Sequence, residues 1–199
     1  MEDGLSLIVG VDEVGRGALA GPVTAAAVLF SKEVLKNRSS IFKDEIKDSK
    51  LLSASKREEL FLKISKFAKV ATSSISHQKI DEVNILEATK LAMKEAVLSL
   101  DLNPELVLID GNITLDLKLT QIPIPGGDRI CFSISAASII AKVTRDRYMI
   151  EIGNKYGNYN FVQNKGYGTK EHMELLRLNG PSPIHRKTFA PLKNRVFEV

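Results

Sequence analysis

Cysteine, tryptophan and histidine are scarce in this sequence of 199 residues, which has one cysteine, three histidines and no tryptophan. The single cysteine, Cys131, excludes an intrachain disulfide and is compatible with a reducing compartment. It lies in an apolar stretch, and we expect a small core residue there. The histidines, His77, His172 and His185, are scattered and lack the ligand spacing of a zinc site. These absences disfavour a disulfide-stapled scaffold and a zinc enzyme.

Membrane-spanning runs, internal repeats, linkers and low-complexity tracts are also missing. The apolar run at residues 5–11 is too short for a signal peptide and follows Glu2 and Asp3. We therefore expect no membrane association and a cytoplasmic location. The formal net charge of +4 fits a nucleic-acid partner, and it fits equally a surface charged for solubility. The length and the 44% hydrophobic content suit one domain with a sizeable core, with a monomer as the default.

Short apolar segments alternate with segments of helical periodicity, which predicts an α/β domain. We expect strands at residues 5–11, 23–30, 69–76 and 106–109. Helix starts are predicted at Ser53, at Asn84 with a capping box to Glu87, and at Thr169, and a further helix is predicted over residues 135–148. Residues 31–46 are expected to form a surface connection. Residues 113–125 are expected to be irregular, because Pro123 and Pro125 limit strand pairing.

Four acidic residues occupy places where a buried sheet meets solvent. Asp12 and Glu13 end the first apolar run, Asp110 follows the run at 106–109, and Asp128 lies in a glycine turn. Any one of them alone fits a loop carboxylate, a helix cap or a salt-bridge partner. Four carboxylates at one sheet edge would raise one another's pKa, and such a cluster persists most readily around a divalent cation.

Carboxylate oxygens select Mg²⁺ or Mn²⁺, and two such ions can clamp the attacking and leaving oxygens of a phosphodiester. Successive strand residues face opposite sides of a sheet, so we expect the first strand to end or twist at Asp12 and Glu13. Glu13 is therefore the weaker candidate as a side-chain ligand. A loop containing Gly15, Arg16 and Gly17 follows, in which glycine permits close backbone approach and arginine suits phosphate.

The string GVDEVGRG at residues 10–17 resembles the ribonuclease HII family, the type 2 ribonucleases H. Further matches follow in the expected order: VLIDG at 107–111, GD at 127–128, SISAASIIAKVTRDR at 133–147 and KGYGT at 165–169. The resemblance implies a ribonuclease H-like fold, with a mixed central sheet, flanking helices and a small helical C-terminal part. It divides the chain into a catalytic domain at residues 1–152 and a helical subdomain at 153–199 packed on it as one structural unit.

The resemblance also implies an activity and the residues that perform it. The family hydrolyses the RNA strand of RNA–DNA hybrids and cuts 5′ to single ribonucleotides embedded in DNA, leaving 3′-OH and 5′-phosphate ends. The catalytic and metal-binding positions fall on Asp12, Glu13, Asp110 and Asp128. The loop that detects the 2′-OH falls on Gly15, Arg16 and Gly17, and the tyrosine that stacks on the sugar at the RNA–DNA junction falls on Tyr167. Lys50 fits a motif expected to help bind phosphate.

Three other functions compete with this one. The sister ribonuclease HIII usually carries an extra N-terminal domain, for which we expect no room before Gly10. A Holliday-junction resolvase on the same fold is disfavoured by the glycine–arginine loop and Tyr167. A non-enzymatic nucleic-acid-binding module would gain from basic groups and lose from four clustered acids.

Other charged residues receive structural interpretations. Asp146, between Arg145 and Arg147, is expected to form a structural ion pair and to bind no metal. Lys142 and Arg145 are expected to be solvated helix charges in preference to phosphate contacts. The C-terminus shows no sliding-clamp peptide, so a clamp partner is not supported.

Overall fold

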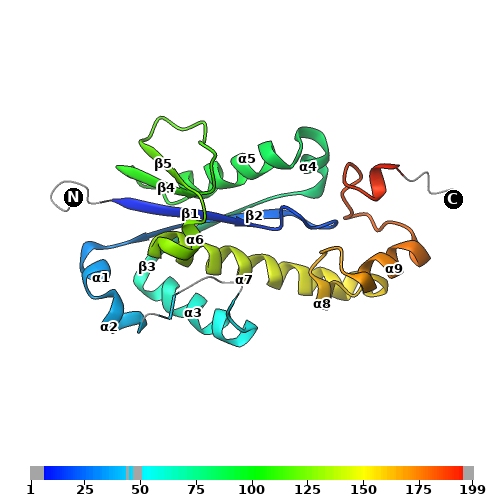
Figure 1. The fold of residues 1–199 in the computed structure, drawn as a ribbon, viewed down its shortest axis with the longest axis horizontal. Helices are drawn as coiled ribbons and strands as arrows, with labels where there is room; N and C mark the ends of the chain where they lie inside the picture. Colours follow the sequence, from blue (N-terminus) through cyan, green and yellow to red (C-terminus); the bar gives the residue numbers. More distant parts are fainter. Residues whose placement is uncertain (1–6, 44, 47–50, 195–199) are drawn as a thin grey trace.

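A mixed five-stranded sheet forms the centre of the computed structural model, which describes residues 7–43, 45–46 and 51–194 (Figure 1). The strands are β1 (Ile8–Val14), β2 (Val23–Phe30), β3 (Ala68–Ile75), β4 (Leu106–Asp110) and β5 (Gln121–Ile124), in the order β3-β2-β1-β4-β5. The β1–β2 and β2–β3 pairs are antiparallel, while β1–β4 and β4–β5 are parallel. The predicted α/β class with a mixed sheet is confirmed.

The strand β5 lies in the segment at 113–125 that was expected to be irregular, and that expectation was wrong for residues 121–124. Pro123 lies in β5 opposite Ile109 of β4. Proline removes one backbone donor, which an edge strand tolerates because its outer side has no partner strand. The β5 strand is at the edge of the sheet, so Pro123 is compatible with pairing.

Helices cover both faces of the sheet. They are α1 (Lys32–Lys36), α2 (Arg38–Phe42), α3 (Ala54–Phe67), α4 (His77–Val83), α5 (Ile85–Leu98), α6 (Gly127–Ile130), α7 (Phe132–Lys155), α8 (Phe161–Asn164) and α9 (Lys170–Asn179). Short 3-10 turns cover Gly157–Tyr159 and Leu192–Asn194. The side chains of Ser53, Asn84 and Thr169 accept hydrogen bonds at the starts of α3, α5 and α9, which confirms the three predicted caps. No described helix is long and apolar enough to cross a membrane.

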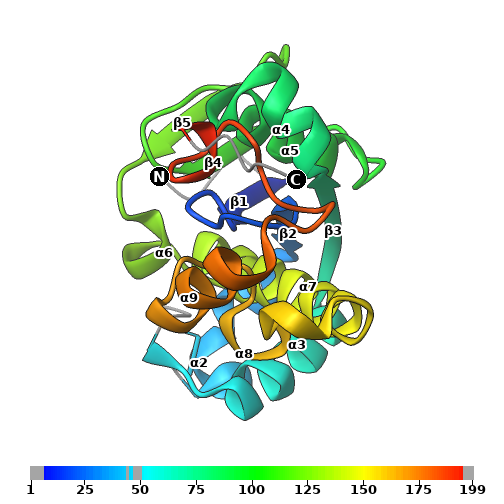
Figure 2. The same ribbon diagram turned by 90° about the vertical axis from the view of Figure 1, so that its right-hand side faces the viewer.

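The fully buried strand β2 separates two apolar cores. On one face, Val23, Ala25 and Ala27 pack with residues of α5 such as Met93. On the other face, Ala26, Val28 and Phe30 pack with residues of α7 and α3. Viewed end-on in Figure 2, α4 and α5 lie on one side of the strands and α7 and α3 on the other. A three-layer arrangement of helices, sheet and helices results.

Residues 31–46 contribute to the core and are not merely a surface connection. Phe42 at the end of α2 is fully buried, and its ring lies 5.7 Å from that of Phe30 and 5.4 Å from that of Phe132. Ser31 caps α1 by accepting the Val34 N–H. The expectation failed because each helix is only five residues long, too short for a helical period to be visible in the sequence.

The long helix α7 links the acidic end of the sheet to the C-terminal helices. It extends to Lys155, seven residues beyond the predicted end, and so passes through the expected boundary at residue 152. A third apolar cluster joins Ala20 and Met149 to Tyr159, Phe161 and Ile184. Figure 1 shows α8 and α9 at one end of α7, next to the loop between β1 and β2. This placement brings C-terminal residues to the glycine-rich loop.

Candidate active site

Two neighbouring parallel strands bring acidic residues to the same edge of the sheet. Asp12 and Glu13 lie on β1, and Asp110 is the last residue of β4, directly after Ile109, which pairs with Val11. One carboxylate oxygen of each acid lies within 4.8 Å of the others. Parallel neighbours place their carboxyl ends together, so these acids, distant in sequence, meet in space.

The fourth acid, Asp128, lies beside this group of three. It is on α6, and its backbone N–H donates to Asp110 Oδ1 over 3.2 Å. Its buried side chain lines the same cavity of about 370 Å³ as the other three acids. We call this hollow the acidic cavity; its other lining residues are Val14, Ser138, Lys142 and Tyr167.

The first strand was expected to end or twist at the two adjacent acids, and it does not end there. The β1 strand continues to Val14, with Asp12 paired to Ala26 and Glu13 to Ala25 on β2. Glu13 nevertheless shares the carboxylate group with Asp12, whose Oδ1 accepts the Glu13 N–H over 2.7 Å. Helix α7 approaches β1 very closely here, because a Cβ at Gly10 would lie 2.3 Å from the Ser133 carbonyl carbon.

The charges in the acidic cavity are costly to hold without a cation. Burial raises the pKa of Asp12 well above its usual range, and the charges of Glu13 and Asp110 raise it further, against a hydrogen bond from Ser138. Burial also raises the pKa of Glu13, and the Arg16 guanidinium opposes that rise. Closely spaced, desolvated carboxylate oxygens match the ligands that a hard divalent cation prefers. The donor set therefore fits a divalent metal, with Asp12, Glu13 and Asp110 nearest to one another.

The glycine loop, residues 15–22, connects β1 to β2 beside the acidic cavity. Arg16 Nη1 lies 3.3 Å from Glu13 Oε1, and about half of the Arg16 side chain is exposed. Gly15 has a φ of +93°, and a Cβ there would lie 2.2 Å from Arg145 Nε. Gly17 is exposed, and a Cβ there would meet nothing within 4 Å. Gly15 is thus required by packing, and packing does not explain Gly17.

Two buried arginines hold the glycine loop from behind. Arg145 of α7 donates to the carbonyls of Pro22 (2.8 Å), Ala20 (3.1 Å) and Lys165 (2.9 Å). Arg186 donates to the carbonyls of Gly21 (3.0 Å), Arg16 (2.9 Å) and Gly15 (2.7 Å). Neither arginine is exposed. The expectation that Arg145 is solvated was wrong, and the role of Arg186 was missed because basic residues near a C-terminus usually read as surface charges.

Tyr167 lines the acidic cavity from the C-terminal part of the chain. Its ring centroid is 5.2 Å from the Arg145 guanidinium carbon and 5.7 Å from Lys142 Nζ. Its backbone forms a bridge with Ala18, while the carbonyl of Gly166 accepts the Leu19 N–H over 2.7 Å. The predicted substrate tyrosine and the predicted glycine loop are therefore neighbours. Lys50, the other predicted substrate residue, lies outside the described residues.

A pair of buried histidines supports the Tyr167 segment. His172 Nδ1 donates to the Tyr167 carbonyl (2.8 Å), so its Nε2 accepts from His185 Nε2 (3.0 Å). His185 Nδ1 in turn accepts from the Ser182 backbone N–H (2.9 Å) and the Ser182 hydroxyl (2.7 Å). These contacts require both imidazoles to be neutral. Burial, the main cause, lowers the pKa of His185 to about 4 and also lowers that of His172.

Asp146 has the expected environment, whereas Lys142 and Cys131 do not. Asp146 forms the predicted ion pair, with Lys142 Nζ at 2.8 Å, and does not belong to the carboxylate group. Lys142 is consequently not a solvated charge: its side chain is 22% exposed and lines the acidic cavity. Cys131 is half-buried at the start of α7, outside the core where it was expected.

Comparison with solved structures defines the class of protein. Ribonuclease H2 from Pyrococcus horikoshii OT3 is 28% identical and superposes with a TM-score of 0.77 over 94% of this chain and 95% of that one. Ribonuclease HII in a PCNA complex from Archaeoglobus fulgidus is 29% identical, with a TM-score of 0.73 over 86% and 87%. Bst-RNase HIII in complex with Mn²⁺ shares the fold, with 18% identity and a TM-score of 0.74 over 96% and 70%. The fold is that of a ribonuclease H-like endoribonuclease.

The family follows from the sequence comparisons. The model of the ribonuclease HII family matches residues 9–192. Ribonuclease HII of Acholeplasma laidlawii is 48% identical over 193 residues, which cover 96% of this chain and 91% of that protein. The chain belongs to the ribonuclease HII family.

Proposed function

We propose that the protein hydrolyses the RNA strand of RNA–DNA hybrids and cuts on the 5′ side of a single ribonucleotide embedded in DNA. The observation that carries the proposal is the meeting of the carboxylate group and the Tyr167 ring at one cavity, with the glycine loop bridged to Tyr167 through Ala18. The acids supply the site for chemistry, and the ring and the loop border the place where a sugar next to the cut would lie.

Asp12, Glu13, Asp110 and Asp128 would hold Mg²⁺ or Mn²⁺, as two ions during catalysis. Bound there, the metal supplies activation of a water molecule and stabilisation of the departing 3′ oxygen. The protein's own contribution is to fix the carboxylates: Ser138 hydrogen-bonds Asp12, and the Asp128 backbone N–H holds Asp110. The raised pKa of Asp12 means that protons compete with the metal, so activity rises with pH.

The glycine loop would recognise the 2′-OH through its backbone. Arg16 and Gly17 are both exposed, and in the described part of the chain neither backbone N–H donates to another group. A 2′-OH can accept from such donors, and it is the group that distinguishes RNA from DNA at a given sugar. Tyr167, fixed at its backbone by Ala18 and His172, would stack on the sugar at the junction. Lys50 is proposed to contact a phosphate.

The absence of histidine from the acidic cavity bears on the products. None of the residues that line the cavity is a histidine, and His172 and His185 are buried and paired with each other. A ribonuclease that attacks with the 2′-OH needs a general base, often histidine. Attack by water leaves a 3′-OH and a 5′-phosphate, with no 2′,3′-cyclic phosphate.

The test is cleavage of an end-labelled DNA duplex that carries one ribonucleotide, with Mg²⁺, with Mn²⁺ and with excess EDTA. We expect one cut 5′ to the ribonucleotide with either metal and none in EDTA, and an all-DNA duplex stays intact as the control. Cleavage in EDTA or a cyclic phosphate end would overturn the metal mechanism. A cut on the 3′ side would overturn the specificity.

Partners and location remain predictions for this chain. The clamp complex is a property of the Archaeoglobus fulgidus protein, and residues 195–199 of this chain lie outside the described part. We keep the predictions of a monomer without a clamp partner and of a cytoplasmic location.

A further inference from the structure

A second hollow adjoins the acidic cavity on the side of α3, α7 and α8. We call it the lysine groove: it has a volume of about 250 Å³, and its charged and polar lining consists of Arg57, Glu58, Lys142, Asp146, Gln163 and Lys165. Of its two carboxylates, Glu58 pairs with Arg147 and Asp146 with Lys142. Lys142 lines both the lysine groove and the acidic cavity. The two hollows therefore adjoin each other at Lys142.

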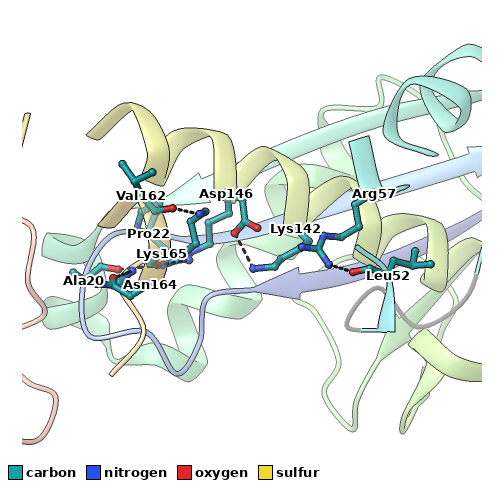
Figure 3. A network of polar contacts seen from close by, with 11 residues as sticks. Ala20, Pro22, Leu52, Arg57, Lys142, Asp146, Val162, Asn164 and Lys165 are labelled. Atoms are coloured by element: carbon teal, nitrogen blue, oxygen red, sulfur yellow. Dashed lines mark hydrogen bonds and ion pairs between the residues drawn. The ribbon is translucent and has the colours of Figure 1, made fainter. Parts of the chain in front are cut away.

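Lys165 is the cation in the groove with the least compensation. Figure 3 shows its ammonium pointing to the backbone carbonyl of Val162, while Lys142 pairs with Asp146. No carboxylate of the described residues lies within salt-bridge distance of Lys165. Burial, with the charges of Lys142 and Arg57, lowers the pKa of Lys165, and Asp146 only partly opposes this. A partly desolvated ammonium of this kind gains from an anion supplied by a ligand.

Resting on the proposed function, we propose that the lysine groove binds a backbone phosphate of the duplex, away from the phosphate that is cut, with Lys165 as its main contact. The charge of the substrate favours such a contact. A duplex is a polyanion, and cations beside the cavity add binding energy through its phosphates. The groove offers such cations where it adjoins the cavity, and Gln163 adds a neutral hydrogen-bonding group.

The first experiment compares Lys165→Gln with Lys118→Gln, which removes the same charge from the exposed loop between β4 and β5. We expect Lys165→Gln to raise KM about 5- to 10-fold with kcat within about twofold, and to reduce the slope of log KM against log salt by about 1. Lys118→Gln should change neither. Equal KM values and salt slopes for the two variants would overturn the proposal, provided that both melt within about 3 °C of the wild type.

The second experiment locates the phosphate. Single neutral methylphosphonates are placed along each strand, and KM is measured with wild type and Lys165→Gln. At one backbone position we expect the neutral link to raise the wild-type KM about as much as Lys165→Gln does, with no further rise when the two are combined. Independent effects at every position would overturn the proposal. Competition by inorganic phosphate that Lys165→Gln abolishes, without a coupled backbone position, would mean that the groove takes only a small free anion.

Failure of the proposed function would be recognised separately. If the wild type cleaves no ribonucleotide-containing duplex, the function is wrong, and the groove is then tested by fluorescence anisotropy of the same labelled duplex. Weaker binding by Lys165→Gln than by Lys118→Gln would support the phosphate site in the lysine groove without the proposed function. Equal binding by the two variants would rule that site out.

Discussion

The acidic cavity and the arginines behind the glycine loop use buried charge in opposite ways. In the cavity, Asp12, Glu13 and Asp110 are like charges within 4.8 Å of one another, and their repulsion and burial have only limited internal relief. Behind the loop, Arg145 and Arg186 are fully buried, and each donates three hydrogen bonds to backbone carbonyls. Charge that its neighbours offset only in part is available to a ligand, whereas charge with a full set of hydrogen-bond partners supports the fold.

The comparison predicts that the two regions fail differently. Losing a carboxylate should abolish catalysis and reduce the charge repulsion in the metal-free protein. Losing a buried arginine should leave carbonyls without donors and so cost stability. Among the described residues no buried side-chain nitrogen or oxygen lacks a partner, so each such deletion creates a new unpaired group.

The largest effect is expected for Asp110→Asn. It removes one of the three converging charges while keeping the shape, and cleavage should fall by a factor of roughly 10³ or more, because metal ions contribute several kcal/mol to such reactions. The control Asp116→Asn removes an exposed carboxylate that pairs with Lys94. Initial rates on a ribonucleotide-containing duplex are compared, and activity of Asp110→Asn within tenfold of the control would contradict the assignment.

Arg186→Met should chiefly destabilise the fold. The carbonyls of Gly15, Arg16 and Gly21 lose their donor, and a loss of about 3 kcal/mol in the free energy of unfolding is expected. Urea unfolding measures this loss. The control is Arg177→Met on the exposed side of α9, whose free energy of unfolding should stay within about 0.5 kcal/mol of the wild type. If Arg186→Met unfolds like that control, the loop does not depend on the buried arginine.

The histidine pair should make stability depend on pH. The folded pKa of His185 is about 4, below the ordinary 6.5, so the unfolded chain takes up the proton first and acid favours unfolding. His185 alone should therefore cost about 3 kcal/mol as the pH falls from about 6.5 to about 4, and His172 shifts in the same direction. Urea midpoints measured across this range give the dependence of stability on pH. His185→Gln should weaken that dependence, and an unchanged dependence would count against the neutral pair.

The smallest effect separates substrates and leaves the fold intact. Tyr167→Ala should lose about tenfold more activity on a single embedded ribonucleotide than on a long RNA–DNA hybrid, because the stacking contact is at the junction. Tyr148→Ala, at a more exposed position on α7, is the control. Equal losses on both substrates, or a melting temperature far below that of the control, would argue against junction reading by Tyr167.

The sequence predicted the acidic cavity better than the arginine support, for a physical reason. Asp12 and Asp110 each follow an apolar run in the sequence, so their place at a sheet edge can be inferred from local pattern. Four of the five strands and the caps at Ser53, Asn84 and Thr169 were predictable in the same way. The roles of Arg145 and Arg186 depend on carbonyls more than 100 residues away in the chain, apart from Lys165, and no local pattern reports them.

Other errors also came from non-local packing. Phe42 is buried by Phe30, Phe67 and Phe132, which lie on three other elements. The pairing of β5 with β4 depends on its edge position, which the sequence does not show. Gly15 was expected to let backbone approach a ligand, and the structure adds a reason from inside the protein, the close approach of Arg145.

The central claim, that the carboxylates are held together for a metal, is tested most directly by melting wild type and Asp12→Asn at pH 8 in EDTA and in Mn²⁺. The pKa of Asp12 is raised in the folded protein, so its charge destabilises the metal-free fold above that pKa. In EDTA, Asp12→Asn should therefore melt about 2–4 °C above wild type. Mn²⁺ should raise the melting temperature of the wild type and not that of the variant, so that the difference between the two proteins disappears or changes sign. The account would be contradicted if the wild type melted above Asp12→Asn in EDTA, or if Mn²⁺ raised the melting temperatures of both proteins equally.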